Sequence, residues 1–181
     1  MLKRILKLTL LTLLAYLLQS TVAAHIQIGD VGPNIAMAMI AVVSVSEGRK
    51  YTFLMSMAVG YLMEIMVGPL DYFYMLLYPV CAMLGALAFS DKSERKLEEE
   101  RSMGKRGGNL PAHLRTPLCA LVSISVYELV NVFYIYLNGV SLDMGHIGRA
   151  LIDVAYTTLL AGVLQFPLRW WLGVYKRKKA R

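Results

Sequence analysis

The chain alternates between long apolar runs and short polar separators. A membrane-spanning helix needs about 20 mostly apolar residues, with about 17 to 25 tolerated. Six runs approach or meet that length, and the second begins at either residue 28 or residue 31: 5–24, 28–46, 51–67, 72–90, 116–138 and 147–172. Three of the separators are tight turns, at residues 47–50, 68–71 and 139–145. Turns this short predict antiparallel neighbouring helices that pack together.

Composition supports a membrane protein. Of 181 residues, 57% are apolar and only 17% are charged, whereas charged residues make up about a quarter of an ordinary soluble domain. The length accommodates one compact domain. We therefore predict an all-α, polytopic membrane protein with a single transmembrane helical domain over residues 1–181.

The basic residues predict the orientation. Lys and Arg accumulate in cytoplasmic loops, because they resist translocation. If the N-terminus is cytoplasmic, seventeen of the 19 basic residues lie on that side, in the N-terminal segment, at Arg49 and Lys50, over residues 92–115 and over residues 176–181. Only Arg149 and Arg169, both within the last run, do not fit this pattern. Six transmembrane helices with both termini cytoplasmic is the consistent solution.

The first run has a second interpretation. Basic residues, an apolar stretch and then small residues at 22–24 also resemble a cleavable secretory signal. The run is long enough to span on its own, however, and its loss would leave an odd number of helices with the basic tail outside. Both observations favour a spanning helix.

Two polar segments are predicted to be cytoplasmic. Residues 91–115 begin with alternating acidic and basic residues at helical i,i+4 spacing, so we expect the fourth helix to continue into a solvated loop, with contact to a cytoplasmic partner or anionic lipid as the alternative. The basic tail at residues 176–181 is expected to interact with anionic lipid headgroups.

Polar side chains inside the predicted spans form a second pattern. A charged residue in the hydrocarbon costs about 2.5 to 3.5 kcal/mol on insertion scales, so each one requires an explanation. At a rise of 1.5 Å per residue, the polar residues of the third, fifth and sixth runs reach similar depths in the outer half of the bilayer. We predict one membrane-embedded polar cluster, made of Glu64, Glu128, Asn131, Arg149 and Asp153.

Two roles are open for this cluster. The first is structural, because charge-assisted hydrogen bonds would hold helices three, five and six together. The second is a binding or proton-handling site built from three carboxyl groups and one arginine. The structural role is favoured, since transport sites are usually accompanied by broken helices, and no such signature is present.

Catalysis has no residues to support it. The sequence contains no Gly-rich phosphate loop, no Ser/His/Asp set and no His-Glu-x-x-His motif. The histidines are far apart, so a metal site is not expected, and the two cysteines lie in apolar runs. We expect neither enzyme activity nor a cofactor. Small residues four apart instead indicate faces for close helix packing or for a partner: Ser56, Gly60, Cys81, Ala82, Gly85 and Ala86.

A set of motifs spread over nearly the whole chain carries a family resemblance. The motifs are a Gln at the end of the first helix, a Pro-Asn pair before the second, a Gly followed four residues later by an acid, and a Gly-Pro-Leu turn: Gln19, Pro33, Asn34, Gly60, Glu64, Gly68, Pro69 and Leu70. An acid also lies within the fifth helix, at Glu128. In this order and spacing the chain resembles the rod-shape-determining MreD family. That family more often has Asp at the positions of Glu64 and Glu128, so these two match by charge alone.

The resemblance implies a scaffold protein of the bacterial cytoplasmic membrane. Members of the family belong to the cell-wall elongation machinery and bind the single-span protein MreC. RodA and a penicillin-binding protein are further partners that the resemblance implies, whereas nucleic acid is not. The family's fold is similar to that of the substrate-binding membrane subunits of energy-coupling-factor vitamin transporters, which supplies the alternative function. A small channel or proton carrier is a third class, and it rests only on the buried carboxyl groups.

Overall fold

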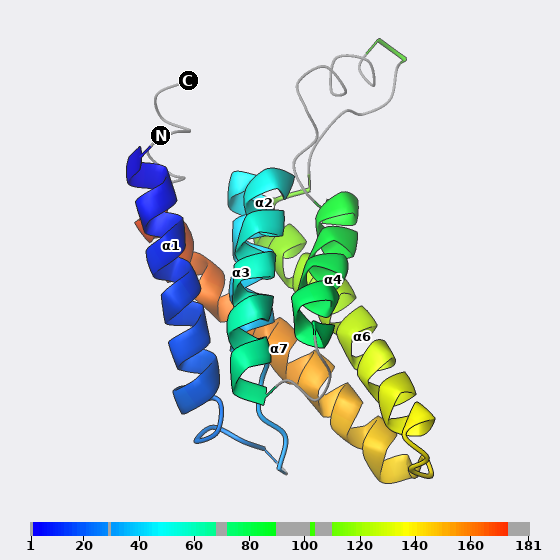
Figure 1. The fold of residues 1–181 in the computed structure, drawn as a ribbon. Helices are drawn as coiled ribbons and strands as arrows, with labels where there is room; N and C mark the ends of the chain where they lie inside the picture. Colours follow the sequence, from blue (N-terminus) through cyan, green and yellow to red (C-terminus); the bar gives the residue numbers. More distant parts are fainter. Residues whose placement is uncertain (1, 29, 68–71, 90–101, 104–109, 174–181) are drawn as a thin grey trace.

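The described part of the chain is helical almost throughout (Figure 1). The computed structural model describes residues 2–28, 30–67, 72–89, 102–103 and 110–173. Its helices are α1 (Leu2–Leu17), which continues into the π-helical turn η1 (Leu18–Val22), then α2 (Ile35–Glu47), α3 (Arg49–Val67), α4 (Phe73–Phe89), α6 (Ala112–Leu137) and α7 (Met144–Trp171). Within these residues the only β-type pairing is an isolated bridge between Ile28 and Val31. The predicted all-α class is confirmed.

Three segments within the described residues are long and apolar enough to cross a membrane. They are Ile5–Val22, His113–Leu137 and Met144–Trp171, whereas α2 and α4 are shorter apolar helices. The 26 residues of α6 and the 28 residues of α7 correspond to about 39 and 42 Å at 1.5 Å per residue. Both helices therefore exceed a hydrocarbon core of about 30 Å, and they run obliquely to α3 and α4 (Figure 1). These features indicate a membrane protein.

Helices that follow one another run antiparallel, so their ends collect at two ends of a bundle (Figure 1). The starts of α1, α3 and α6 lie at the same end as the last turns of α2, α4 and α7. We call this the basic end, because the basic residues that the structure places there are Lys7, Arg49, Lys50, Arg115 and Arg169. Arg149, in the second turn of α7, lies toward the opposite end.

The central element of the bundle is α2. Every residue from Ile35 to Val45 is buried, and the helix packs against α3, α4, α6 and α7. Its sequence of Ala, Met, Ile and Val is apolar around the whole circumference, as expected for a helix enclosed by others. In contrast, α1 lies at the periphery, where Leu11 and Ala15 are buried while Leu6, Leu10 and Leu17 are exposed.

The predicted small-residue faces are used for packing inside the bundle. At Gly60, a Cβ atom would lie 2.6 Å from the carbonyl oxygen of Tyr74 in α4, and at Gly85 it would lie 2.8 Å from that of Cys119 in α6. The other members of these faces are buried as well: Ser56, Cys81, Ala82 and Ala86. These faces are therefore internal contacts of α3 with α4 and of α4 with α6, and they are not available to a partner.

Some predicted segments lie outside the described residues. These are the Gly68-Pro69-Leu70 turn, the basic tail at 176–181 and the predicted continuation of the fourth helix beyond residue 89. The hydrophilic loop over 91–115 is described only at residues 102–103 and 110–115, the last four of which belong to α6.

Candidate functional site

The start of α2 is the most polar point inside the bundle. A helix leaves its first N–H groups without intrahelical partners, and these groups need other acceptors where no water is present. The N-cap residue Asn34 accepts a hydrogen bond from the Met37 N–H at its Oδ1 atom, at 2.9 Å. The Asn34 N–H donates to Thr157 Oγ1 in the middle of α7, at 2.8 Å. The Pro33 carbonyl accepts from the Ile35 N–H.

Gln19 completes this junction from η1. Its side-chain Oε1 accepts a hydrogen bond from the Ala36 N–H at 3.1 Å, and its Nε2 donates to the Pro33 carbonyl at 3.4 Å. One amide side chain therefore serves both a donor and an acceptor of the α2 start. This accounts structurally for Gln19, Pro33 and Asn34, three residues of the family-like motif.

Asp153 connects the junction to α6. The hydroxyl group of Thr157 donates to Asp153 Oδ1 at 2.7 Å, one helical turn away along α7. The side chains of Asp153 and Glu128 are also hydrogen-bonded to each other. Because a carboxylate can only accept, two carboxyl groups form a hydrogen bond only when one of them carries a proton. The chemistry that this pair offers is the sharing of one proton between α6 and α7.

Three tyrosines line the same region. Tyr78 is buried, and its hydroxyl group donates to Asn34 Oδ1 at 3.4 Å. Its ring meets the ring of Tyr127 edge-on, with centroids 5.6 Å apart, and that of Tyr74 at 6.4 Å. Tyr74 and Tyr127 are hydrogen-bonded through their side chains. We call the whole set the polar junction: Gln19, Asn34, Tyr74, Tyr78, Tyr127, Glu128, Asp153 and Thr157.

Glu64 has a separate role at the edge of this junction. Its Oε2 atom accepts a hydrogen bond from the Tyr74 N–H at 2.6 Å and is 3.4 Å from the Met75 N–H. The carboxyl group thus caps the first turn of α4, where the positive end of the helix dipole favours an acceptor with negative charge. Glu64 therefore joins α3 to α4.

The five predicted residues do not form one cluster: Glu64 bonds to the first turn of α4, and two further members have no part in the polar junction. The Arg149 side chain is exposed, and Asn131 is half-buried. Neither side chain forms a hydrogen bond or an ion pair with any residue that the structure describes. Arg149 and Asp153 are both in α7, but Asp153 turns toward Thr157 and Glu128, whereas Arg149 remains on the outside. The helices are consequently connected by the hydrogen bonds among Asp153, Thr157 and Glu128. The predicted clamp through Arg149 is absent from the described residues.

The tyrosines and Thr157 could not be recognised from composition alone. Thr157 follows Asp153 by four residues, so both lie on one helix face, and this spacing was the available signal. Tyr78 and Tyr127 lie in different runs, and only the packing of α4 against α6 brings their rings together. Among the described residues no group of three His, Cys, Asp or Glu side chains is placed to hold a metal ion.

In comparisons with known proteins, no family model, no curated protein and no solved structure matches the chain.

Proposed function

We propose that this chain crosses the bacterial cytoplasmic membrane six times, with the basic end of the bundle in the cytoplasm. The antiparallel order of the helices and the gathering of basic residues at one end support this topology. The 13 residues of α2 reach only about 20 Å, but the buried residues Val31, Pro33 and Asn34 continue its path toward the opposite end. Irregular backbone is compatible with a membrane where protein surrounds it and satisfies its hydrogen bonds.

We further propose that the protein is a scaffold subunit of the rod-shape complex and holds an MreC-like single-span partner. One observation carries this proposal. The described residues of the family-like motif are all used to connect helices: Gln19, Pro33 and Asn34 at the start of α2, and Gly60 and Glu64 between α3 and α4. A protein whose motif residues maintain the positions of its helices is suited to presenting a fixed surface to other membrane proteins.

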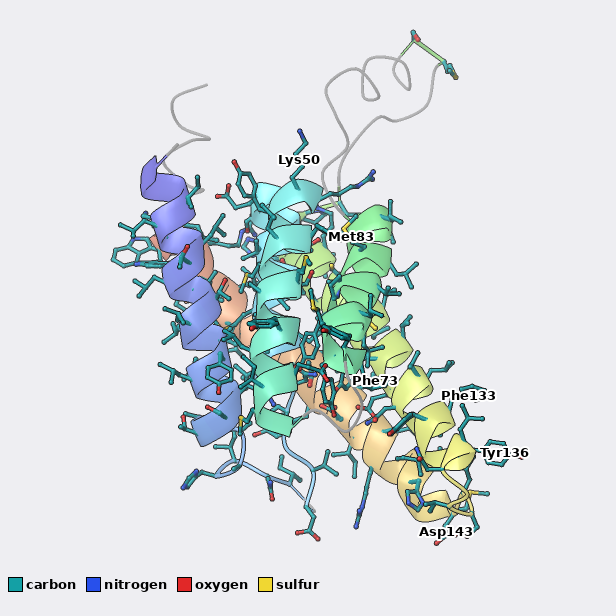
Figure 2. The ribbon with its side chains drawn as sticks, in the orientation of Figure 1. Lys50, Phe73, Met83, Phe133, Tyr136 and Asp143 are labelled. Carbon is teal, nitrogen blue, oxygen red and sulfur yellow. The ribbon has the colours of Figure 1, made fainter. Side chains whose placement is uncertain are left out.

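Because the small-residue faces are internal, the partner must contact outward-facing helices. Three exposed positions sample these surfaces: Leu10 on α1, Phe133 on α6 and Leu159 on α7. Figure 2 shows Phe133 projecting away from the bundle. Packing between helices in lipid depends on such close contacts, since water does not drive it.

Site-specific photo-crosslinking in cells tests the scaffold. A photoreactive amino acid at Leu10, Phe133 or Leu159 should crosslink to an MreC-like protein from at least one of the three positions. The buried Val59 is the matched control and should give no crosslink. If none of the three positions crosslinks and the purified protein carries no MreC-like partner, the scaffold proposal is wrong.

The alternative is a substrate-binding membrane subunit of a vitamin transporter of the energy-coupling-factor type. The observation in its favour is that α2 begins inside the bundle beside Asp153 and Tyr78, since interrupted helices often border membrane binding sites. Equilibrium binding of vitamins to the purified protein distinguishes the two functions. Nanomolar affinity, which corresponds to about 12 kcal/mol, would favour the transporter.

A further inference from the structure

A groove runs between α1 and α3 on the outside of the bundle. It encloses about 350 Å³. Its floor is formed by the buried residues Thr12 and Met55, and its rims include the exposed side chains Leu13, Leu54 and Tyr61. The remaining lining residues are Ile5, Leu8, Thr9, Tyr51, Ala58 and Leu62. The groove is therefore open to whatever surrounds the protein.

The groove is more apolar than its sequence suggests. Its two threonines direct their hydroxyl groups to their own helix: Thr9 donates to the Ile5 carbonyl at 3.1 Å and Thr12 to the Leu8 carbonyl at 2.9 Å. Such bonds leave the methyl group to face outward. The polar groups that remain are the two tyrosine hydroxyls, one near each end of the α3 wall. An occupant must therefore be apolar along most of its length.

Polar contacts attach α1, and the π-helical turn η1 that follows it, to α7 and α2, in addition to the packing of α1 against α3. At the basic end, Lys7 Nζ donates to the Trp171 carbonyl at 2.8 Å and lies 5.7 Å from the Trp171 ring centroid. At the other end, Gln19 is bonded to the start of α2. These contacts fix the two ends of the α1–η1 segment relative to α7 and α2.

The length of the groove decides what can fill it. Its α3 wall runs from Tyr51 to Leu62, which is about 17 Å at 1.5 Å per residue. One leaflet of a hydrocarbon core about 30 Å thick measures about 15 Å. The groove thus extends from the basic end only to the middle of the bundle. A spanning partner helix would need a surface twice as long, whereas one acyl chain matches this length.

A positive charge marks the open end of the groove. Lys50 is exposed, and Figure 2 shows it projecting beyond the start of α3. It precedes Leu54 by four residues, so both side chains lie on the same face of α3. Lys50 forms no hydrogen bond or ion pair with another described residue, which leaves its ammonium group available to a phosphate at the membrane surface.

We propose that the α1–α3 groove binds one anionic phospholipid of the leaflet at the basic end. Its acyl chain lies along Leu54, Ala58 and Leu62, and its phosphate meets Lys50. The bound chain fills the space that α1 leaves beside α3 and so supports the position of α1. This site is independent of the scaffold function, because it requires only the protein and a lipid.

Native mass spectrometry of the purified protein tests the site, with palmitoyl-oleoyl phosphatidylglycerol as the probe and phosphatidylcholine of the same chains as the neutral comparison. The wild-type protein should retain one phosphatidylglycerol in preference to phosphatidylcholine. Ala58→Trp fills the groove and should abolish retention. Lys50→Gln should reduce retention of phosphatidylglycerol about five-fold, because one basic residue near an anionic surface strengthens binding by about this factor.

The matched control is Ala155→Trp, which introduces the same side chain at an exposed position of α7 and should leave retention unchanged. A photoactivatable phosphatidylglycerol provides a second measurement without substitutions, and it should label residues 5–13 and 51–62 above other exposed segments. Equal retention by Ala58→Trp and wild type, equal retention of the two lipids, or labelling spread evenly over α1, α6 and α7 would each overturn the proposal. So would crosslinking of the groove to a partner helix in place of lipid.

Discussion

At Asp153, two hydrogen bonds from different helices meet on one carboxyl group. Oδ1 accepts from Thr157, which itself accepts from the start of α2, and the carboxyl group also bonds with Glu128 of α6. The loss of this side chain therefore affects three helices at once. Its effect should depend on whether the replacement can still form hydrogen bonds.

We expect Asp153→Asn to be tolerated and Asp153→Ala to be destabilising. The amide oxygen of Asn can accept from Thr157 while its NH₂ group donates to Glu128, so stability should fall by less than about 1 kcal/mol. Alanine leaves Thr157 and Glu128 without this partner inside the bundle, at a cost of about 1–3 kcal/mol. Thermal unfolding of the purified protein in detergent measures both variants. Equal losses would show that the hydrogen bonds do not contribute.

Arg149 is the opposite case. Its side chain is exposed and has no hydrogen-bond or ion-pair partner in the described part of the chain. Its long stem allows the charge to reach the membrane surface near the start of α7. Arg149→Gln should therefore change stability by no more than about 0.5 kcal/mol. The same unfolding assay applies, and a loss of several kcal/mol would indicate that Arg149 is an internal ion-pair partner after all.

At this scale, sequence reasoning identified the right acidic residues but not their partners. Helical rise predicted similar depths for Glu128 and Asp153, and the structure places these two side chains next to each other. Arg149 and Asp153 are four residues apart and share a face of α7, yet Arg149 is exposed and Asp153 is buried. Spacing within one helix does not reveal which of its turns are covered by other helices. The three tyrosines were not predicted as members of the cluster, because aromatic contacts between α4 and α6 leave no spacing signal within either helix.

Close contacts between helices depend on two glycines. We predict that substitution of these glycines lowers stability more than substitution of other helical glycines. Gly60→Ala and Gly85→Ala place a methyl group against backbone oxygens, at 2.6 and 2.8 Å, so the helices must separate at a cost of about 1–3 kcal/mol. Gly162→Ala in α7 is the matched control. Its Cβ would meet nothing within 4 Å, and the variant should gain about 0.5–1 kcal/mol from helix propensity. Unfolding midpoints in detergent should therefore shift in opposite directions.

The residue at which α2 begins is encoded in its local sequence. The hydrophobic run suggested a start at residue 28 or 31, but the helix begins at Ile35. Pro33 disfavours a helical conformation at the residue before it, and Asn34 is a preferred N-cap residue. The sequence therefore contained the signal for a helix start at Pro33 and Asn34, but the prediction followed the apolar run instead. What the sequence could not supply is the identity of the distant partners, Gln19 and Thr157, that satisfy this helix start.

For the whole molecule, the labelling of single cysteines in intact cells should establish the orientation. We expect Ser141→Cys, in the exposed turn between α6 and α7, to react with a membrane-impermeant reagent, and Met103→Cys to react only after the membrane is opened. The native Cys81 and Cys119 are fully buried, so they should contribute little background. The reverse labelling pattern would contradict a cytoplasmic basic end.

The succession of apolar helices in the described residues was predictable, because apolar runs and polar separators are local properties of the sequence. Their packing was not. The central position of α2 results from the packing of side chains from five helices. No single apolar run reveals that α2 is central and α1 is peripheral. The α1–α3 groove is likewise formed by residues of two helices that are distant in sequence, so neither run reveals it alone.

The junction at Asn34 also constrains the order in which the protein can be made. During synthesis, α2 leaves the ribosome more than a hundred residues before Thr157, the residue that accepts its first N–H group. Until α7 is complete, the start of α2 lacks this partner in a surrounding that offers no water to replace it. We therefore expect the newly made chain to remain incompletely packed until α7 is complete. A chain truncated before residue 157 should be recognised as unfinished and degraded.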